Sequence, residues 1–148
     1  MTKVAIVDFG MGNLWSIKTA VEYLGFPVEQ VTRADKLQSF RKIIIPGVGS
    51  FQLGMQRLKD SGLDIAIREH VNQGNDILGI CLGMQLLCGS STEGGKCSGL
   101  GIVEGDILNF RSSQKDFMHP VPHMGFNKVE WKTTGSNCLL CEGLGEQA

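Results

Sequence analysis

The sequence predicts an α/β fold with a mostly parallel central sheet and helices on both faces. Four short strand-like runs, three of them almost wholly apolar, alternate with segments in which apolar residues recur at helical spacing, and this alternation is typical of βαβ units. The apolar runs are nearly continuous, as expected of parallel strands that are buried on both faces. Glycine-rich breaks follow the first and third runs, where the chain must turn out of a strand.

The first half of the predicted sheet comes from residues 3–9 and residues 27–31. Residues 10–13, which include two glycines, end the first strand. Apolar residues then recur at helical spacing through residues 14–24, and Gly25 is placed to end this helix. The second strand follows directly, so the opening of the chain forms one strand–helix–strand unit.

Residues 43–45 are the third predicted strand, and residues 46–49 stop it with a Pro-Gly-Val-Gly turn. Apolar stripes in residues 53–58 and 63–71 predict two helices after this turn. Residues 77–80 form the fourth apolar run. The pattern therefore continues as strand, two helices and strand.

The pattern changes beyond Cys88. Residues 89–101 are rich in glycine and serine, and we expect a loop there. Residues 101–110 and 126–131 are predicted to be strands of a more irregular, mixed second half. No repeat or linker composition interrupts the chain, so residues 1–148 are taken as a single domain.

Composition narrows the class of protein. A length of 148 residues, with 42% hydrophobic and 20% charged residues, is that of an ordinary globular domain. A net charge of −1 gives no electrostatic reason to expect nucleic acid or an anionic membrane as partner. The first apolar run is too short for a secretory leader, and the odd count of five cysteines favours reduced thiols. We expect a cytoplasmic protein.

Two cysteine motifs offer different chemistry. Cys138 and Cys141 form one Cys-x-x-Cys pair without a matching second pair, so we expect no metal and no cofactor. Gly79-x-Cys81-x-Gly83, between an apolar run and a predicted helix, is the cysteine form of the nucleophile elbow. The alternative on pattern alone is a buried cysteine in a chain with 20 glycines.

The elbow explains the spacing of its residues. In so sharp a turn, backbone segments meet at the base, where only glycine avoids a clash on either side of the nucleophile. The turn lifts the Cys81 Sγ above the strand ends and points helix amides at it, which favours the thiolate. The Leu82 N–H is one predicted oxyanion donor, and the loop carrying Gly47 and Gly49 supplies another. The alternative for that loop is a tight strand exit without a function.

Five segments resemble, in order along the chain, the triad-type (class I) glutamine amidotransferases, and among them the glutaminase subunits of imidazole glycerol phosphate synthases. The resemblance implies a flavodoxin-like three-layer architecture that lacks its C-terminal strands, and it extends over essentially all 148 residues. The segments are residues 7–14, 46–51, 79–85, 91–94 and 122–127.

The resemblance implies glutamine hydrolysis. Cys81 would attack the side-chain amide, and the amides of Gly49 and Leu82 would hold the oxyanion. It also implies substrate-binding roles for Gly47, Val48 and Gln85. For Gln85, a polar residue on a short helix is the alternative reading. Glu93 matches a Ser-x-Glu-Gly loop of the family, where we expect a structural or substrate-side hydrogen bond.

The His-x-Glu pair that supplies the catalytic base of the family does not occur in this sequence. In the family a histidine is followed two residues on by glutamate, but His70, His119 and His123 lack such a glutamate. We expect His70 to be a semi-buried histidine whose ring nitrogens are hydrogen-bonded, and His119 to lie in a surface loop. Either the chain is a truncated glutaminase subunit or it is a degenerate copy that docks without catalysis. The intact elbow favours truncation, which should expose an apolar sheet edge and leave the chain inactive by itself.

The resemblance also implies a partner. In histidine biosynthesis the glutaminase subunit delivers ammonia to a (β/α)₈-barrel cyclase in a heterodimer. The residues predicted to meet the cyclase are Asn13, Met124, Phe126 and Asn127, together with Leu14 and Trp15. Core positions for Trp15 and Phe126 are the alternative. Phe126 stands where tryptophan is usual, which leaves open a paralogue that supplies ammonia for sugar amidation in surface-polysaccharide synthesis.

Overall fold

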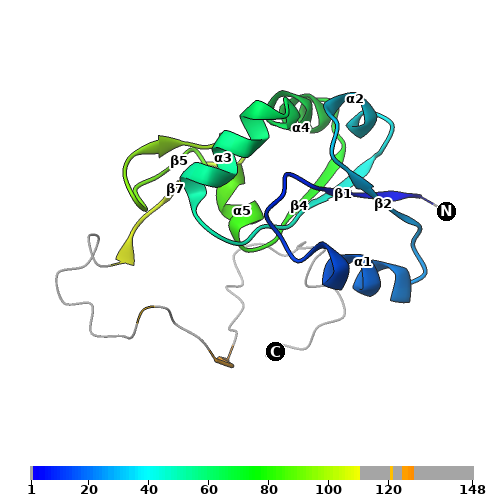
Figure 1. Ribbon diagram of the computed structural model, residues 1–148, viewed down its shortest axis with the longest axis horizontal. Helices are drawn as coiled ribbons and strands as arrows, with labels where there is room; N and C mark the ends of the chain where they lie inside the picture. The colour runs from blue at the N-terminus through cyan, green and yellow to red at the C-terminus, as the bar shows by residue number, and fades with distance from the viewer. Residues whose placement is uncertain (1, 111–120, 122–124, 129–148) are drawn as a thin grey trace. The chain divides into compact units, whose positions relative to one another are not determined.

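The computed structural model describes residues 2–110, 121 and 125–128 of the chain (Figure 1). The chain divides into two compact units, Met1–Lys115 and Asp116–Ala148. All helices and strands of the described residues lie in the first unit. In the second unit, Val121 and Phe126 are exposed.

The first unit contains a parallel sheet of four strands in the order β2-β1-β3-β4. Because all four strands point the same way, the loops that follow their carboxyl ends gather at one edge. The parallel sheet predicted from the apolar runs is confirmed. The strands are β1 (Val4–Val7), β2 (Val28–Val31), β3 (Lys42–Ile45) and β4 (Asp76–Gly79).

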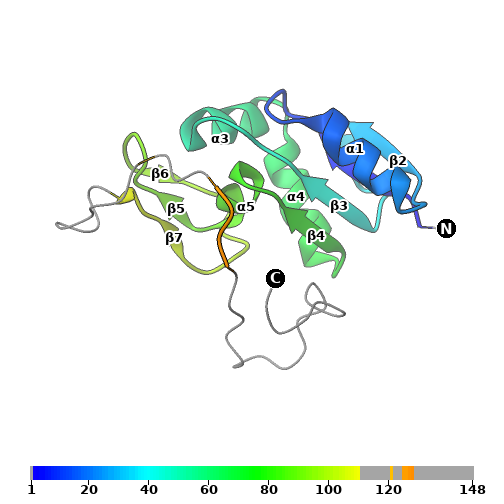
Figure 2. The same ribbon diagram turned by 90° about the horizontal axis from the view of Figure 1, so that it is seen from below.

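Helices cover both faces of this sheet, as predicted. Figures 1 and 2 show α1 on one face and α2, α3 and α4 on the other. The one-turn helix α2 was not predicted, because its four residues are too few to display a helical period. The helices are α1 (Leu14–Tyr23), α2 (Ala34–Leu37), α3 (Phe51–Asp60), α4 (Leu63–Asn72) and α5 (Leu82–Leu87).

Local chemistry sets the ends of α1. The Asn13 side chain accepts a hydrogen bond from the Ser16 amide (3.2 Å) and so caps the first turn. Gly25, with φ of +82°, follows the last turn in a conformation that favours glycine. The predicted beginning and end of this helix are confirmed.

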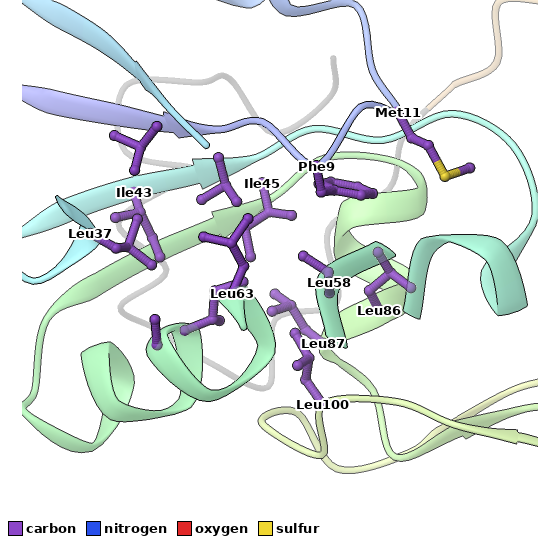
Figure 3. Packing of buried hydrophobic residues seen from close by; sticks show 14 of the residues in the cluster. Phe9, Met11, Leu37, Ile43, Ile45, Leu58, Leu63, Leu86, Leu87 and Leu100 are labelled. Atoms are coloured by element: carbon purple, nitrogen blue, oxygen red, sulfur yellow. The ribbon is translucent and has the colours of Figure 1, made fainter. Parts of the chain in front are cut away.

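The main core lies between the sheet and helices α3, α4 and α5 (Figure 3). Ile43 and Ile45 of β3 point into it, and Phe51, Leu63 and Leu86 meet them from the three helices. All of these side chains are buried, and each contributes about 1.5–3 kcal/mol by leaving water. This packing fixes α3 and α5 against the strand ends where the candidate site lies.

On the sheet face that α1 covers, the side chains become more exposed from β1 through β3 to β4. Ile6, Ile44 and Leu78 lie side by side in register and point away from the main core. Ile6 is 0% exposed, Ile44 9% and Leu78 36%. Within the described residues β4 is an edge strand, because it pairs with β3 only. The apolar face of the sheet is therefore partly open at β4.

Residues 89–107 depart from the prediction. The expected loop over residues 89–101 contains β5 (Ser90–Ser91) and β6 (Cys97–Ser98), so that prediction was wrong. The expected strand over residues 101–110 is reduced to β7 (Asp106–Ile107). These strands form a small mixed sheet, β6-β5-β7, with one antiparallel and one parallel pair. Two-residue strands of mostly polar residues carry no alternating signal.

The last predicted strand, residues 126–131, is wrong for residues 126–128, which form no strand. Residues 129–131 lie outside the described part of the chain. Among the described residues, none of the helices is long and apolar enough to cross a membrane.

Candidate active site

Cys81 stands at a strained corner between β4 and α5. Its backbone has φ of +55° and ψ of −119°, and within the described residues it is the one non-glycine residue with a positive φ. Such a conformation costs about 1–3 kcal/mol and persists only when the surroundings enforce it. The Cys81 side chain is exposed. This geometry is that of a nucleophile elbow, which the sequence predicted.

Hydrogen bonds on both sides hold the corner. The Ile80 amide donates to the Ile45 carbonyl (2.9 Å) and continues the pairing with β3. The Gly83 amide then donates to the Ile80 carbonyl (3.0 Å), and the Gln85 amide donates to the Cys81 carbonyl (3.1 Å). The helix α5 therefore begins at Leu82, directly after Cys81, which is its N-cap residue.

Glycines on either side of Cys81 are required by space. A Cβ at Gly83 would lie 1.8 Å from the Ile45 carbonyl oxygen. A Cβ at Gly79 would lie 2.5 Å from the Met84 Cα. Both obstacles are backbone atoms, so a side chain at either place would force β4 and α5 apart. The prediction that the spacing reflects steric need is confirmed.

The loop of residues 46–49 packs against this corner. A Cβ at Gly47 would lie 2.9 Å from the Leu82 Cβ and 2.9 Å from the Gly83 amide nitrogen. Gly49 has φ of +109°, which lets its peptide take a direction closed to other residues. Within the described residues, the amides of Gly49 and Leu82 donate to no other residue. The structure thus brings the two predicted oxyanion donors onto adjoining segments.

The other predicted substrate residues lie on the same segments. Val48 is exposed in the middle of the loop, and Gln85 is half-buried on α5, one turn beyond Cys81. Glu93 lies in a different loop, where its amide donates to the buried Ser91 hydroxyl (3.1 Å). This bond gives the Glu93 segment a structural anchor.

His70 is far from the chemistry of Cys81. It is 1% exposed, and its Nε2 is 3.0 Å from the carbonyl oxygen of Asp76, the first residue of β4, whereas Cys81 lies two residues beyond the other end of this strand. Its Nδ1 has no partner among the described residues. His70 is thus more buried than the semi-buried position that we expected, and the expected pairing of its ring nitrogens holds for Nε2 but not, within the described residues, for Nδ1. His119 and His123 lie outside the described residues.

An ion pair lies at the start of β4. The Lys42 ammonium donates to the Asp76 carboxylate across the two neighbouring strands. This hydrogen bond and the charge of Lys42 lower the pKa of Asp76 below its ordinary value. The pair lies at the amino end of the sheet and does not reach Cys81.

The predicted partner-facing residues fall into both units. Asn13 has a structural task as the cap of α1, and Trp15 is 74% exposed rather than buried in the core. Phe126 is also exposed and belongs, with Asn127, to the second unit. Met124 lies outside the described residues. A joint docking surface of these residues therefore stays a prediction.

Sequence reasoning missed Arg57. This exposed residue of α3 donates through Nη1 to the Gly10 carbonyl (2.7 Å). No pattern in the sequence pointed to it, because a single arginine on the outer face of a helix is ordinary. It borders a hollow of about 540 Å³ at the carboxyl ends of β1 and β2, which does not include Cys81. The lining residues are Asp8, Phe9, Gly10, Thr32, Arg57, Asp60 and Ser61.

The other thiols differ from Cys81. Cys88 is buried and Cys97 is half-buried, and neither stands at a strand-to-helix corner. Cys138 and Cys141 lie outside the described residues. Within the described part of the chain, no three His, Cys, Asp or Glu residues gather in a way that could hold a metal ion.

Comparisons with known proteins agree with this geometry. Residues 13–115 match the family model of the CobB/CobQ-like glutamine amidotransferase domain, a span that includes the loop of residues 46–49 and the elbow. The chain belongs to the glutamine amidotransferases. The family prediction made from the sequence is confirmed.

Curated relatives place the chain more narrowly within this family. It is 41% identical over 136 residues to imidazole glycerol phosphate synthase subunit HisH of Moorella thermoacetica, covering 92% of this chain and 62% of that protein. It is also 41% identical over 146 residues to the same subunit of Sulfurimonas denitrificans, covering 97% and 68%. The chain thus spans about 62% of the length of the first of these relatives.

A solved structure supports the fold. A crystal structure of a glutamine amidotransferase superposes with a TM-score of 0.68 at 20% identity, covering 84% of this chain and 63% of that chain. At this identity the likeness concerns the fold. It confirms the predicted α/β glutamine amidotransferase architecture.

Proposed function

We propose that this chain is the glutamine-hydrolysing part of an imidazole glycerol phosphate synthase and releases ammonia for histidine biosynthesis. The observation that carries the proposal is the strained Cys81 corner, with φ of +55°, at the start of α5. Relatives at about 40% identity that carry the name HisH support the choice of synthase.

The arrangement suits acyl transfer from an amide. The Cys81 thiolate attacks the side-chain amide carbon of glutamine, and the carbonyl electron pair moves onto its oxygen. The amides of Gly49 and Leu82 would stabilise that oxyanion, a contribution of about 3–4 kcal/mol per donor in other enzymes. The carbon–nitrogen bond then breaks and ammonia leaves with an added proton. Water cleaves the remaining thioester, which releases glutamate and restores the thiol.

The substrate would be held by the segments beside the nucleophile. We assign Gly47 and Val48 to the backbone contacts that glutamine makes with the loop, since both precede the Gly49 donor. Gln85 lies on α5 one turn beyond Cys81 and would hydrogen-bond the substrate through its side-chain amide. These roles rest on the resemblance of residues 46–51 and 79–85 to the family and on their contact with the elbow.

Proton transfer needs a group that the described residues do not place beside Cys81. His70 is buried at the opposite end of β4. We therefore propose that the 148-residue chain hydrolyses glutamine very slowly by itself, because losing the base of a cooperating triad removes most of the acceleration. The oxyanion donors and substrate binding supply what remains.

Ammonia release from glutamine tests the proposal. The assay compares this chain with a longer chain extended by the C-terminal third of the Moorella thermoacetica subunit, and each is measured with a Cys81→Ala control. We expect slow turnover in the short chain, much faster turnover in the extended chain, and none above background in either control. Equal rates in the short and extended chains would show that His70, His119 or His123 is the base.

We further propose a cytoplasmic heterodimer with a (β/α)₈-barrel cyclase. Ammonia protonates and dilutes in solvent, so the chemistry favours a closed path between the two sites. Exposed Trp15 next to the Asn13 cap is suited to such an interface, where tryptophan is enriched. Glutamine-dependent formation of imidazole glycerol phosphate by the extended chain and a cyclase tests the assignment. Cyclase binding without ammonia release would instead identify a docking subunit.

A further inference from the structure

Three loops pack in a row at the carboxyl edge of the sheet. The loop after β1 contacts the loop after β3, because a Cβ at Gly12 would lie 3.3 Å from the Pro46 Cβ. The loop after β3 in turn contacts the elbow through Gly47, as its 2.9 Å approach to Leu82 shows. A displacement of the first loop is therefore transmitted to the second, which carries the proposed oxyanion donor Gly49.

Met11 is the side chain that joins the first loop to Gly49. Its Cε lies 2.7 Å from the position that a Cβ at Gly49 would occupy, and the Met11 side chain is 9% exposed. Figure 3 shows Met11 at the end of the buried cluster, next to this edge of the sheet. The thioether fills the space that a side chain at Gly49 would take, so it limits where the Gly49 peptide can move.

The first loop is itself clamped at Gly10 from two directions. The Asp8 carboxylate accepts a hydrogen bond from the Gly10 amide (2.9 Å), and Arg57 donates to the Gly10 carbonyl (2.7 Å). Gly10 has φ of +77°, a conformation that favours glycine, and the two hydrogen bonds hold its backbone in that conformation. Arg57 lies on α3, the helix that begins directly after the loop of residues 46–49.

We propose that Arg57 is a positioning residue for the oxyanion donor Gly49. Arg57 holds Gly10, the fixed loop holds Met11 against Gly49, and Gly49 thereby keeps its amide in the direction that an oxyanion needs. This inference rests on the proposed function of the site. Oxyanion donors must be placed within about 0.5 Å to act, so a loosened buttress affects reactivity before it affects folding.

The stability cost of losing Arg57 is small. Gly10 is exposed, so water can replace the guanidinium at its carbonyl, and the loss of this hydrogen bond costs little stability. Arg57→Gln should therefore fold. Arg57→Lys keeps a cation near the Gly10 carbonyl and should restore part of any loss. Lys59→Gln, on the same helix, removes an equal charge from an exposed side chain without a partner among the described residues.

Two reagents that react differently with Cys81 separate positioning from general damage. The chloroketone analogue of glutamine is attacked at its carbonyl, passes through an oxyanion and loses chloride as the thioether forms. Dithiodipyridine is attacked at sulfur and releases thiopyridone, so no oxyanion forms. Modification of Cys81 by each reagent is followed over time by peptide mapping of the full 148-residue chain.

We expect Arg57→Gln to slow the chloroketone reaction at Cys81 by about tenfold or more and to leave the dithiodipyridine reaction within about twofold. Arg57→Lys should recover part of the chloroketone rate, and Lys59→Gln should match the parent chain. Equal slowing of both reactions, or no slowing, would overturn the positioning role. Failure of the parent chain to react with the chloroketone at Cys81 would instead refute the proposed function itself.

Discussion

Gly83→Ala is the substitution that most directly challenges the packing beneath Cys81. The added Cβ would lie 1.8 Å from the Ile45 carbonyl oxygen, whereas Cβ atoms in proteins essentially never approach closer than 3.0 Å. The first turn of α5 must therefore move by about 1.2 Å, the difference between those two distances. The obstacle is backbone in the central sheet, so it cannot yield by rotating a side chain.

The expected cost follows from this displacement. Overpacking a core costs about 1–3 kcal/mol, and a backbone obstacle places this site at the upper end. Alanine has a better helix propensity than glycine by about 1 kcal/mol, which offsets part of the loss. We expect a net loss of about 2 kcal/mol in the free energy of unfolding, together with a chloroketone reaction of Cys81 slowed by about a hundredfold.

Urea unfolding and peptide-mapped modification of Cys81 measure the two effects. Gly25→Ala is the matched control, because Gly25 has φ of +82° and a Cβ there meets nothing within 4 Å. That control should lose about 1 kcal/mol through backbone strain and leave the reactivity of Cys81 unchanged. If Gly83→Ala has the unfolding midpoint and Cys81 reactivity of the parent chain, the reasoning about the elbow is refuted.

Three further predictions concern stability. Cys81→Gly should be more stable than Cys81→Ala by about 1 kcal/mol in urea unfolding, because glycine relieves the positive φ; the reverse order would contradict the strain. Asp76→Asn should lower the free energy of unfolding at neutral pH, because it removes the ion pair with Lys42. Because the folded pKa of Asp76 is lowered, this deficit should vanish as pH falls through and below the ordinary value of 3.8; a deficit independent of pH would exclude the ion pair as its cause. Phe51→Ala, at a fully buried position, should cost about 3–5 kcal/mol, and a loss below 1 kcal/mol would contradict its place in the core.

The regular part of the fold was predictable because its signals are local. Continuous apolar runs indicated β1, β3 and β4, and Gly25 marked the end of α1. The small sheet of β5, β6 and β7 was not predictable, since its pairing depends on loops that meet only in three dimensions. The single turn of α2 likewise depends on one buried side chain, Leu37, rather than on a repeating pattern.

The site shows the same division. The Gly79-x-Cys81-x-Gly83 spacing predicted the elbow because the steric need lies within one turn of chain. The link from Arg57 to Gly10 joins residues 47 positions apart, so no local pattern announces it. Asn13 was predicted to contact a partner, and its role as the cap of α1 emerged only from the hydrogen bond to Ser16.

Protection of Cys81 by glutamine would show whether this residue is the nucleophile of a glutamine-hydrolysing site. The chain is treated with a limiting amount of the chloroketone analogue with and without excess L-glutamine, and modification of all five cysteines is quantified by peptide mapping. We expect Cys81 to be modified first, and we expect glutamine, but not glutamate or asparagine at equal concentration, to slow its modification. Preferential modification of Cys88, Cys97, Cys138 or Cys141, or a rate at Cys81 that glutamine does not change, would contradict this role of Cys81.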